Sequence, residues 1–227
     1  GELNGKLVLI EWGLMLSGGL VLAALISQWF FIAAVFLSLA AVFYNVKPLR
    51  MKEKVYLDVL VESVHNPIRL TMGWLVVTSE IVPPASLLLG YLMGGAFLMA
   101  AKRLAEYRFI NDPVQAGLYR HSFRFYTQEN LLVSMFFYAT SCSLFLGVFM
   151  VKYKIELLLV LPLLAALFAA YLHTGFKPNS LVQSPERLYQ DRGFMAWVLL
   201  TIAASTAIYL SDIPWLSAFL NQAFVNR

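Results

Sequence analysis

The residues most suited to chemistry fall in two polar stretches that border apolar segments. The first stretch, YNVKPLRMKEKVYLD, covers residues 44–58. It contains a tyrosine, three cations and a carboxylate that could contact a phosphorylated ligand: Tyr44, Lys47, Arg50, Lys52 and Asp58. Lys and Arg bind phosphate oxygens, and carboxylates bind the Mg²⁺ that accompanies phosphates. A basic border that attracts anionic lipid is the alternative interpretation of the same residues.

A stripe of ionisable residues continues from this stretch into an apolar segment. Asp58, Glu62, His65 and Arg69 are separated by four, three and four residues, which places them on one face of a helix. Ionisable groups at membrane depth are costly and usually face a bundle interior or a wet cavity. The stripe therefore predicts the wall of a polar substrate cavity, or a structural network that neutralises itself. Pro67 removes a backbone donor and is expected to loosen this helix.

The second polar stretch, KRLAEYRF, covers residues 102–109 at the end of another apolar segment. Lys102 and Glu106 are four residues apart, as are Arg103 and Tyr107. This spacing predicts a cation–carboxylate pair and an Arg–Tyr pair on adjacent helix faces. The NDP sequence at 111–113 should end the helix. The segment AGLYRHSFRFY that follows it is either an interfacial helix with aromatic anchors or part of a binding site.

Together these features predict a cationic pocket that contains carboxylates and binds a phosphorylated or pyrophosphorylated substrate with Mg²⁺. The sequence contains no Walker loop, GxGxxG, HExxH or zinc-type Cys/His spacing. The histidines, His65, His121 and His173, are scattered, which argues against a histidine-based metal site. Cys142 lies in an apolar run and is interpreted as a structural thiol.

These stretches must be positioned by membrane helices, because the chain is 60% hydrophobic and only 13% charged. A soluble domain carries about 25% charged residues. We expect an all-α, polytopic transmembrane helical bundle that forms a single domain over residues 1–227. Seven segments have about the length that a transmembrane helix needs. They are residues 7–27, 30–46, 57–78, 82–101, 129–150, 154–173 and 194–211.

The distribution of charge predicts an orientation. If the spans alternate, most of the 17 Lys and Arg residues lie on one side of the membrane, which the positive-inside rule assigns to the cytoplasm. We therefore expect a multi-pass protein of the inner or plasma membrane. Its catalytic loops would be cytoplasmic and its C-terminus on the opposite side. Basic loops also explain the sequence pI near 9.2, so no nucleic-acid partner is expected.

With these motifs, the chain resembles the UbiA superfamily of intramembrane prenyltransferases, most members of which have nine helices. On this resemblance the seven segments correspond to helices three to nine. Residues 44–58 fall at the family's Tyr/Lys element, and residues 102–108 fall at its second acidic motif. Lys102, Arg103 and Glu106 replace the usual aspartates, a variation similar to the Lys-Arg-Tyr-Ala-Glu of the decaprenyl-phosphate phosphoribosyltransferase branch. The later SPERLYQDRGF is similar to the loop before that branch's last helix.

The resemblance implies transfer of a 5-phosphoribosyl group from phosphoribosyl pyrophosphate to a polyprenyl phosphate, with Mg²⁺ and release of pyrophosphate. It implies that Lys47, Arg50 and Lys52 contact phosphates and that Lys102 and Arg103 bind the donor's phosphate end. Asp58 and Glu106 would be the catalytic carboxylates, which hold donor hydroxyls, water or Mg²⁺. The deeper wall would be formed by Glu62, His65 and Arg69. The family's main Asp-rich metal motif is expected upstream of Gly1, so the chain is interpreted as N-terminally incomplete.

Two other functions stay open on the sequence. An ordinary member of the superfamily would move a polyprenyl group from its diphosphate to an aromatic acceptor, although the KRLAEYR stretch argues against it. A non-catalytic membrane subunit or a transporter is the other alternative, and the ionisable stripe would then line a pathway. Membrane lipids are expected partners in every case, and assembly into a homo-oligomer or a larger membrane complex stays open.

Overall fold

The computed structural model describes residues 5–78, 81–177 and 180–216, and within them the chain is helical with no strand. Eight α-helices follow one another along the chain: α1 (Gly5–Ile26), α2 (Gln28–Asn45), α3 (Leu57–Val77), α4 (Ala85–Ile110), α5 (Pro113–Tyr119), α6 (Gln128–Tyr153), α7 (Leu161–Phe176) and α8 (Arg192–Leu210). Short 3₁₀ helices occupy the connections: η1 (Met51–Glu53), η2 (His121–Arg124), η3 (Ile155–Val160), η4 (Leu181–Gln183) and η5 (Pro185–Gln190). The predicted all-α class is confirmed.

Six helical segments of the described chain are long and apolar enough to cross a membrane: α1, α2, α4, α6, η3 with α7, and α8. The remaining predicted span corresponds to α3, which has 21 residues but carries the ionisable stripe. Because those side chains lower its apolar character, α3 does not qualify on composition, and its crossing of the membrane stays a prediction. It continues through Pro67 as one helix.

Local sequence determines several of the helix ends. The side chains of Ser27, Thr127 and Asp191 accept hydrogen bonds from backbone N–H groups in the first turns of α2, α6 and α8. At the other end, α4 stops at Asn111, which has a left-handed conformation with φ of 52°. The predicted end at NDP is therefore confirmed, and the KRLAEYRF stretch is the last part of a 26-residue helix.

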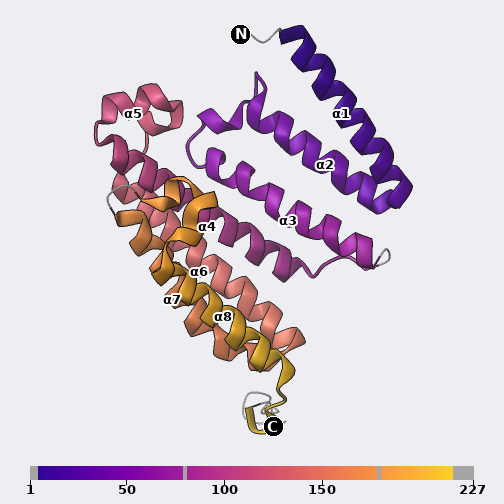
Figure 1. Ribbon diagram of the computed structural model, residues 1–227, viewed down its shortest axis with the longest axis vertical. Helices are drawn as coiled ribbons and strands as arrows, with labels where there is room; N and C mark the ends of the chain where they lie inside the picture. The colour runs from indigo at the N-terminus through magenta and orange to yellow at the C-terminus, as the bar shows by residue number, and fades with distance from the viewer. Residues whose placement is uncertain (1–4, 79–80, 178–179, 217–227) are drawn as a thin grey trace, which may run out of the picture.

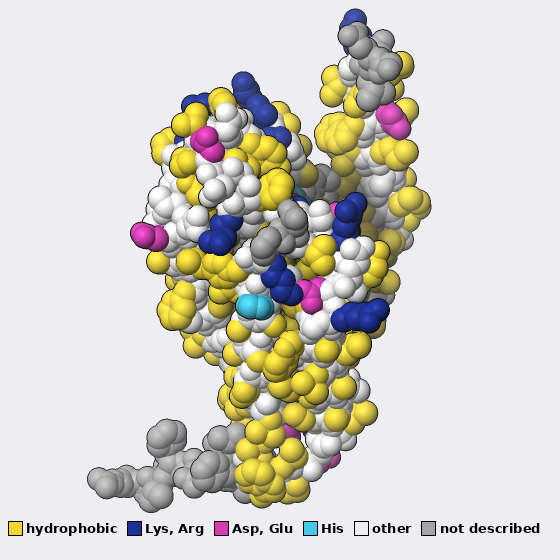
Figure 2. All heavy atoms as spheres, turned by 60° about the vertical axis from the view of Figure 1, so that its left-hand side comes forward, with side chains coloured by type: hydrophobic (Ala, Val, Ile, Leu, Met, Phe, Trp, Pro, Cys, Tyr) yellow, Lys and Arg dark blue, Asp and Glu magenta, His cyan; other side chains and the backbone are white. Residues whose placement is uncertain are grey.

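The helices form a sequential arrangement in which α1, α2 and α3 lie on one side and α6, α7 and α8 on the other (Figure 1). α3 packs against α4, and α4 packs against both α6 and α7. The α2–α3, α4–α6 and α7–α8 connections, together with the start of α1, lie at one end of the helices, which we call the basic end. Most of the lysines and arginines lie there, and Figure 2 shows dark-blue side chains mainly in the upper half of the molecule.

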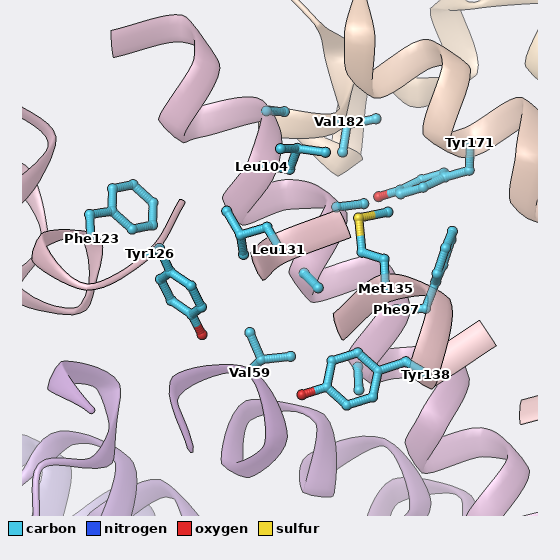
Figure 3. Close-up of a cluster of buried hydrophobic side chains, with 14 of the residues drawn as sticks. Val59, Phe97, Leu104, Phe123, Tyr126, Leu131, Met135, Tyr138, Tyr171 and Val182 are labelled. Atoms are coloured by element: carbon cyan, nitrogen blue, oxygen red, sulfur yellow. The ribbon is translucent and has the colours of Figure 1, made fainter. Parts of the chain in front are cut away.

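The core lies where α4 meets its neighbours (Figure 3). Four alanines of α4 are almost fully buried and let the helices approach closely: Ala96, Ala100, Ala101 and Ala105. Larger side chains such as Phe97, Leu131 and Met135 fill the remaining space. Large apolar side chains on α1 and α8 are exposed instead, for example Leu25 at 77% and Leu210 at 78%. Such an exposed apolar surface suits contact with lipid.

Candidate functional site

A buried carboxylate, Asp58, is the centre of a polar cluster at the basic end. It lies in the first turn of α3 and has 0% of its surface exposed. Its Oδ1 accepts a hydrogen bond from the Tyr126 hydroxyl at 2.7 Å. Its Oδ2 accepts from the Ser122 hydroxyl at 3.0 Å and from Arg120 Nη1 at 3.4 Å, and Arg103 Nε lies 3.6 Å away. We call these five residues the Asp58 cluster.

The connection between α4 and α6 supplies three of the four partners of Asp58. It carries Arg120 and Ser122 in or beside η2, and Tyr126 just before α6. The Tyr126 hydroxyl also accepts a hydrogen bond from the Tyr56 backbone N–H at 2.7 Å, where the chain has a φ of 63°. Burial, together with the neighbouring carboxylate, raises the pKa of Tyr126, so the phenol stays protonated and keeps donating. The cluster therefore fixes this connection onto the start of α3.

Arg103 joins the cluster to the second polar stretch. Its side chain is only 4% exposed, and its Nη1 lies 2.8 Å from Glu106 Oε2. The Tyr44 phenol at the end of α2 is near enough to interact electrostatically with Arg103. The predicted pairing of Lys102 with Glu106 is wrong, because burial of Arg103 between two carboxylates makes it the better partner. Tyr107 packs edge-on against the Phe123 ring, so the predicted Arg–Tyr pair is also wrong.

Lys102 lies elsewhere, at a cavity of about 390 Å³ bounded by α3, α4, α7, η5 and α8. The lining is mainly apolar, with Leu98, Phe168 and Phe194 among its side chains, while Lys102 and Asn66 add polar groups. Gly95 leaves space for the Asn66 side chain, because a Cβ there would collide with the Asn66 amide. The arrangement can accept an apolar chain whose anionic end meets Lys102.

The basic segment between α2 and α3 is ordered by its own contacts. Arg50 Nε lies 3.1 Å from Glu53 Oε1, and Lys52 Nζ donates to Asn45 Oδ1 at 3.1 Å. Lys47 is exposed. The structure therefore places these three cations at the basic end. The side chain of Arg50 is 35% exposed.

The ionisable stripe of α3 is split between two environments. Asp58 pairs with groups from other elements, so the stripe does not neutralise itself among the described residues. Glu62 and His65 are half-buried, and His65 Nδ1 lies 2.9 Å from the Glu62 carbonyl oxygen. Arg69 is exposed. Asp58 thus supports the fold, whereas Glu62, His65 and Arg69 remain candidates for contact with a ligand along the face of α3.

The carboxylates of the described residues do not form a Mg²⁺ site by themselves. Both oxygens of Asp58 already accept hydrogen bonds, and two guanidinium groups lie beside them. Glu106 Oε2 is paired with Arg103. Within residues 5–78, 81–177 and 180–216, no three His, Cys, Asp or Glu side chains come together as metal ligands. Asp58 and Glu106 therefore do not fit Mg²⁺ as a site of their own.

The structure thus brings Tyr44, Asp58, Arg103 and Glu106 together, and places Lys102 at a separate cavity. Sequence reasoning missed Ser122 and Tyr126 as partners of Asp58. It noted Arg120 only as part of an amphipathic segment. The signal that could have found them is the density of polar side chains in RHSFRFY next to a predicted helix break. Comparison of the chain with protein-family models, curated proteins and solved structures finds no match.

Proposed function

We propose that the protein is a membrane-embedded transferase that moves a 5-phosphoribosyl group from phosphoribosyl pyrophosphate to a polyprenyl phosphate. The observation that carries this proposal is the mainly apolar cavity with Lys102 in its lining. The Arg103–Glu106 pair lies on the same helix but outside that cavity. A polyprenyl chain needs an apolar path, and its phosphate needs a cation where that path reaches polar surroundings. The cavity and the basic end meet both needs within one bundle.

In the proposed reaction, a phosphate oxygen of the lipid forms a bond to C1 of the ribose. The bond from C1 to pyrophosphate breaks, and its electron pair leaves with pyrophosphate. Lys102 holds the lipid phosphate. The cations of the segment between α2 and α3, Lys47, Arg50 and Lys52, stabilise the negative charge that develops on the leaving group. Holding both reactants at one end of the bundle removes much of the entropic barrier to their meeting.

Arg103 and Glu106 have different tasks in this proposal. Glu106 is half-buried and has one carboxylate oxygen, Oε1, that is not engaged by Arg103, so it can accept a hydrogen bond from a ribose hydroxyl. Arg103 is held in place by Asp58 and Glu106 and orients the latter. Asp58 has no exposed surface, so it is a positioning residue that acts through Arg103.

The test uses the full gene product purified in detergent with Mg²⁺, which pyrophosphate groups ordinarily bind. Labelled phosphoribosyl pyrophosphate is offered with polyprenyl phosphate, and incorporation of label into lipid is measured. Glu106→Ala and Lys102→Ala should each reduce transfer at least about tenfold. Lys54→Ala removes an exposed cation of the same end and should leave transfer unchanged.

A parallel reaction distinguishes the aromatic prenyltransferase alternative. Polyprenyl diphosphate is offered with 4-hydroxybenzoate, because the same cavity would accept that lipid chain. Activity only in this reaction would replace the proposed donor. Absence of activity from both reactions, with folded protein, would favour a non-catalytic subunit or a transporter.

A further inference from the structure

A polar pocket lies at the basic end, where α4 and α7 end. Its volume is about 280 Å³, and Arg108, Lys177 and Gln183 contribute its polar side chains. Phe109 and Phe176 form apolar edges. Arg108 is six residues beyond Lys102 on α4, which places the two cations about 120° apart around the helix. The hollow, which we call the α4–α7 pocket, is therefore separate from the cavity used by the proposed reaction.

Arg108 is held in the α4–α7 pocket in a defined position. Its Nη1 donates to Gln128 Oε1 at 2.8 Å, and its guanidinium carbon lies 4.8 Å from the centre of the Phe176 ring. In the part of the chain that the structure describes, this is the only hydrogen bond that the side chain donates to protein. A guanidinium has five N–H groups, so it keeps donors for an anionic ligand.

Lys177 provides a second cation from the end of α7. Its Nζ donates to Asp191 Oδ2 at 2.6 Å, and its side chain is 46% exposed. Asp191 also accepts a hydrogen bond from the Phe194 N–H at 3.0 Å, and this bond caps the first turn of α8. The ammonium has three donors, so a phosphate can bind it alongside Asp191, although the carboxylate competes for the cation.

An apolar groove meets the α4–α7 pocket at Lys177. The groove runs between α7 and α8, has a volume of about 470 Å³, and is lined by Ala166, Ala169 and Ala170 with Trp197 opposite. Lys177 lines both hollows. A cationic pocket that continues into an apolar groove along two membrane-type helices matches one ligand chemistry, a phosphate group attached to an acyl chain.

We propose that this composite site binds an anionic phospholipid, with its phosphate at Arg108 and Lys177 and one acyl chain in the groove between α7 and α8. Charge complementarity selects the headgroup, and the alanines of α7 leave space for the chain. The lipid would hold α4, α7 and α8 together at the basic end, outside the reacting centre. It is a bound component of the bundle and takes no part in group transfer.

Native mass spectrometry of the detergent-purified protein tests the site. Phosphatidylglycerol and phosphatidylcholine are added separately, and the bound fraction is measured against lipid concentration. Phosphatidylglycerol should bind more tightly. Arg108→Gln and Lys177→Gln should each weaken its binding about fivefold. Arg187→Gln, which removes an exposed cation of the same end that lines neither hollow, should change nothing.

Two further variants distinguish lipid binding from a structural role of the same residues. Asp191→Asn keeps an acceptor for the Phe194 N–H but removes the charge that competes for Lys177, so phosphatidylglycerol should bind more tightly. Ala169→Trp should fill the groove and weaken binding while the headgroup contacts stay intact.

Three results would overturn the proposal. Equal affinity for phosphatidylglycerol and phosphatidylcholine would show that Arg108 and Lys177 do not select an anionic headgroup. If Arg108→Gln and Asp191→Asn both bind phosphatidylglycerol as tightly as wild type does, the lipid does not bind at this site. This conclusion holds even if Lys177→Gln fails to fold. Displacement of phosphatidylglycerol by an equal concentration of inorganic phosphate would show that the pocket takes free phosphate and that the groove holds no acyl chain.

Discussion

The Asp58 cluster permits a quantitative prediction about stability. Asp58→Asn keeps the size of the side chain but removes the negative charge between Arg103 and Arg120. Arg103 is 4% exposed and Arg120 is 22% exposed, so water can replace the carboxylate only poorly. Removing one partner of a buried ion pair costs about 3–5 kcal/mol.

The expected loss lies near the lower limit of that range. Arg103 keeps Glu106 as a partner at 2.8 Å, and the new amide can still accept from Tyr126 or Ser122. We therefore expect Asp58→Asn to lower the free energy of unfolding by about 3 kcal/mol. For a chain of this size that corresponds to a fall of about 6–12 °C in melting temperature.

Thermal unfolding in a mild detergent, followed by near-ultraviolet circular dichroism, measures this effect at a fixed scan rate. Glu129→Gln is the matched control, because Glu129 is exposed in the first turn of α6. The double variant Asp58→Asn/Arg103→Met should lose less than the sum of its single variants, since each single variant already breaks the same Asp58–Arg103 interaction. A melting temperature of Asp58→Asn within about 2 °C of wild type, as for the control, would refute the reasoning.

Three other predictions follow from local geometry. Gly90→Leu should destabilise the bundle by about 1–3 kcal/mol, because a Cβ there would lie 2.9 Å from Leu146 Cδ2, whereas Gly73→Leu faces open space and should be tolerated in a melting assay. The hydrogen bond from Lys177 holds the pKa of Asp191 below its ordinary value, so the stability it provides is present above about pH 4 and is lost as pH falls through the lower, folded-state pKa. Melting curves across the acid range should therefore fall less steeply for Asp191→Asn, and parallel curves would contradict this. Burial raises the pKa of Tyr126, so Tyr126 contributes stability that is present below about pH 10 and is lost as pH rises through the higher, folded-state pKa. Tyr126→Phe should therefore reduce the loss of stability at alkaline pH. Because the Tyr126 phenol of the folded protein is neutral below about pH 10, the substitution should remove no phenolate absorbance there.

Composition and periodicity were sufficient to predict the helices. All seven predicted segments are helical, because long apolar runs have few alternatives in a chain with so few charges. Beyond the apolar span predicted to end at 101, α4 continues as a helix to Ile110, where the NDP sequence was expected to end it. Lys102, Arg103 and Glu106 are compatible with helix, so only NDP ends it.

The sequence by itself determined that this is an all-helical chain with membrane-type segments and polar residues gathered toward one end, because apolar length and helical spacing are local properties. It also identified Asp58, Arg103 and Glu106 as residues of interest. Only the tertiary structure decided that Asp58 meets Arg120, Ser122 and Tyr126, which are 62, 64 and 68 residues away. Spacing places a side chain on a face of its own helix, but which neighbour that face meets depends on how the helices pack around α4. The separation of Lys102 from Arg103 has the same cause, since a rotation of about 100° per residue directs adjacent side chains into different surroundings.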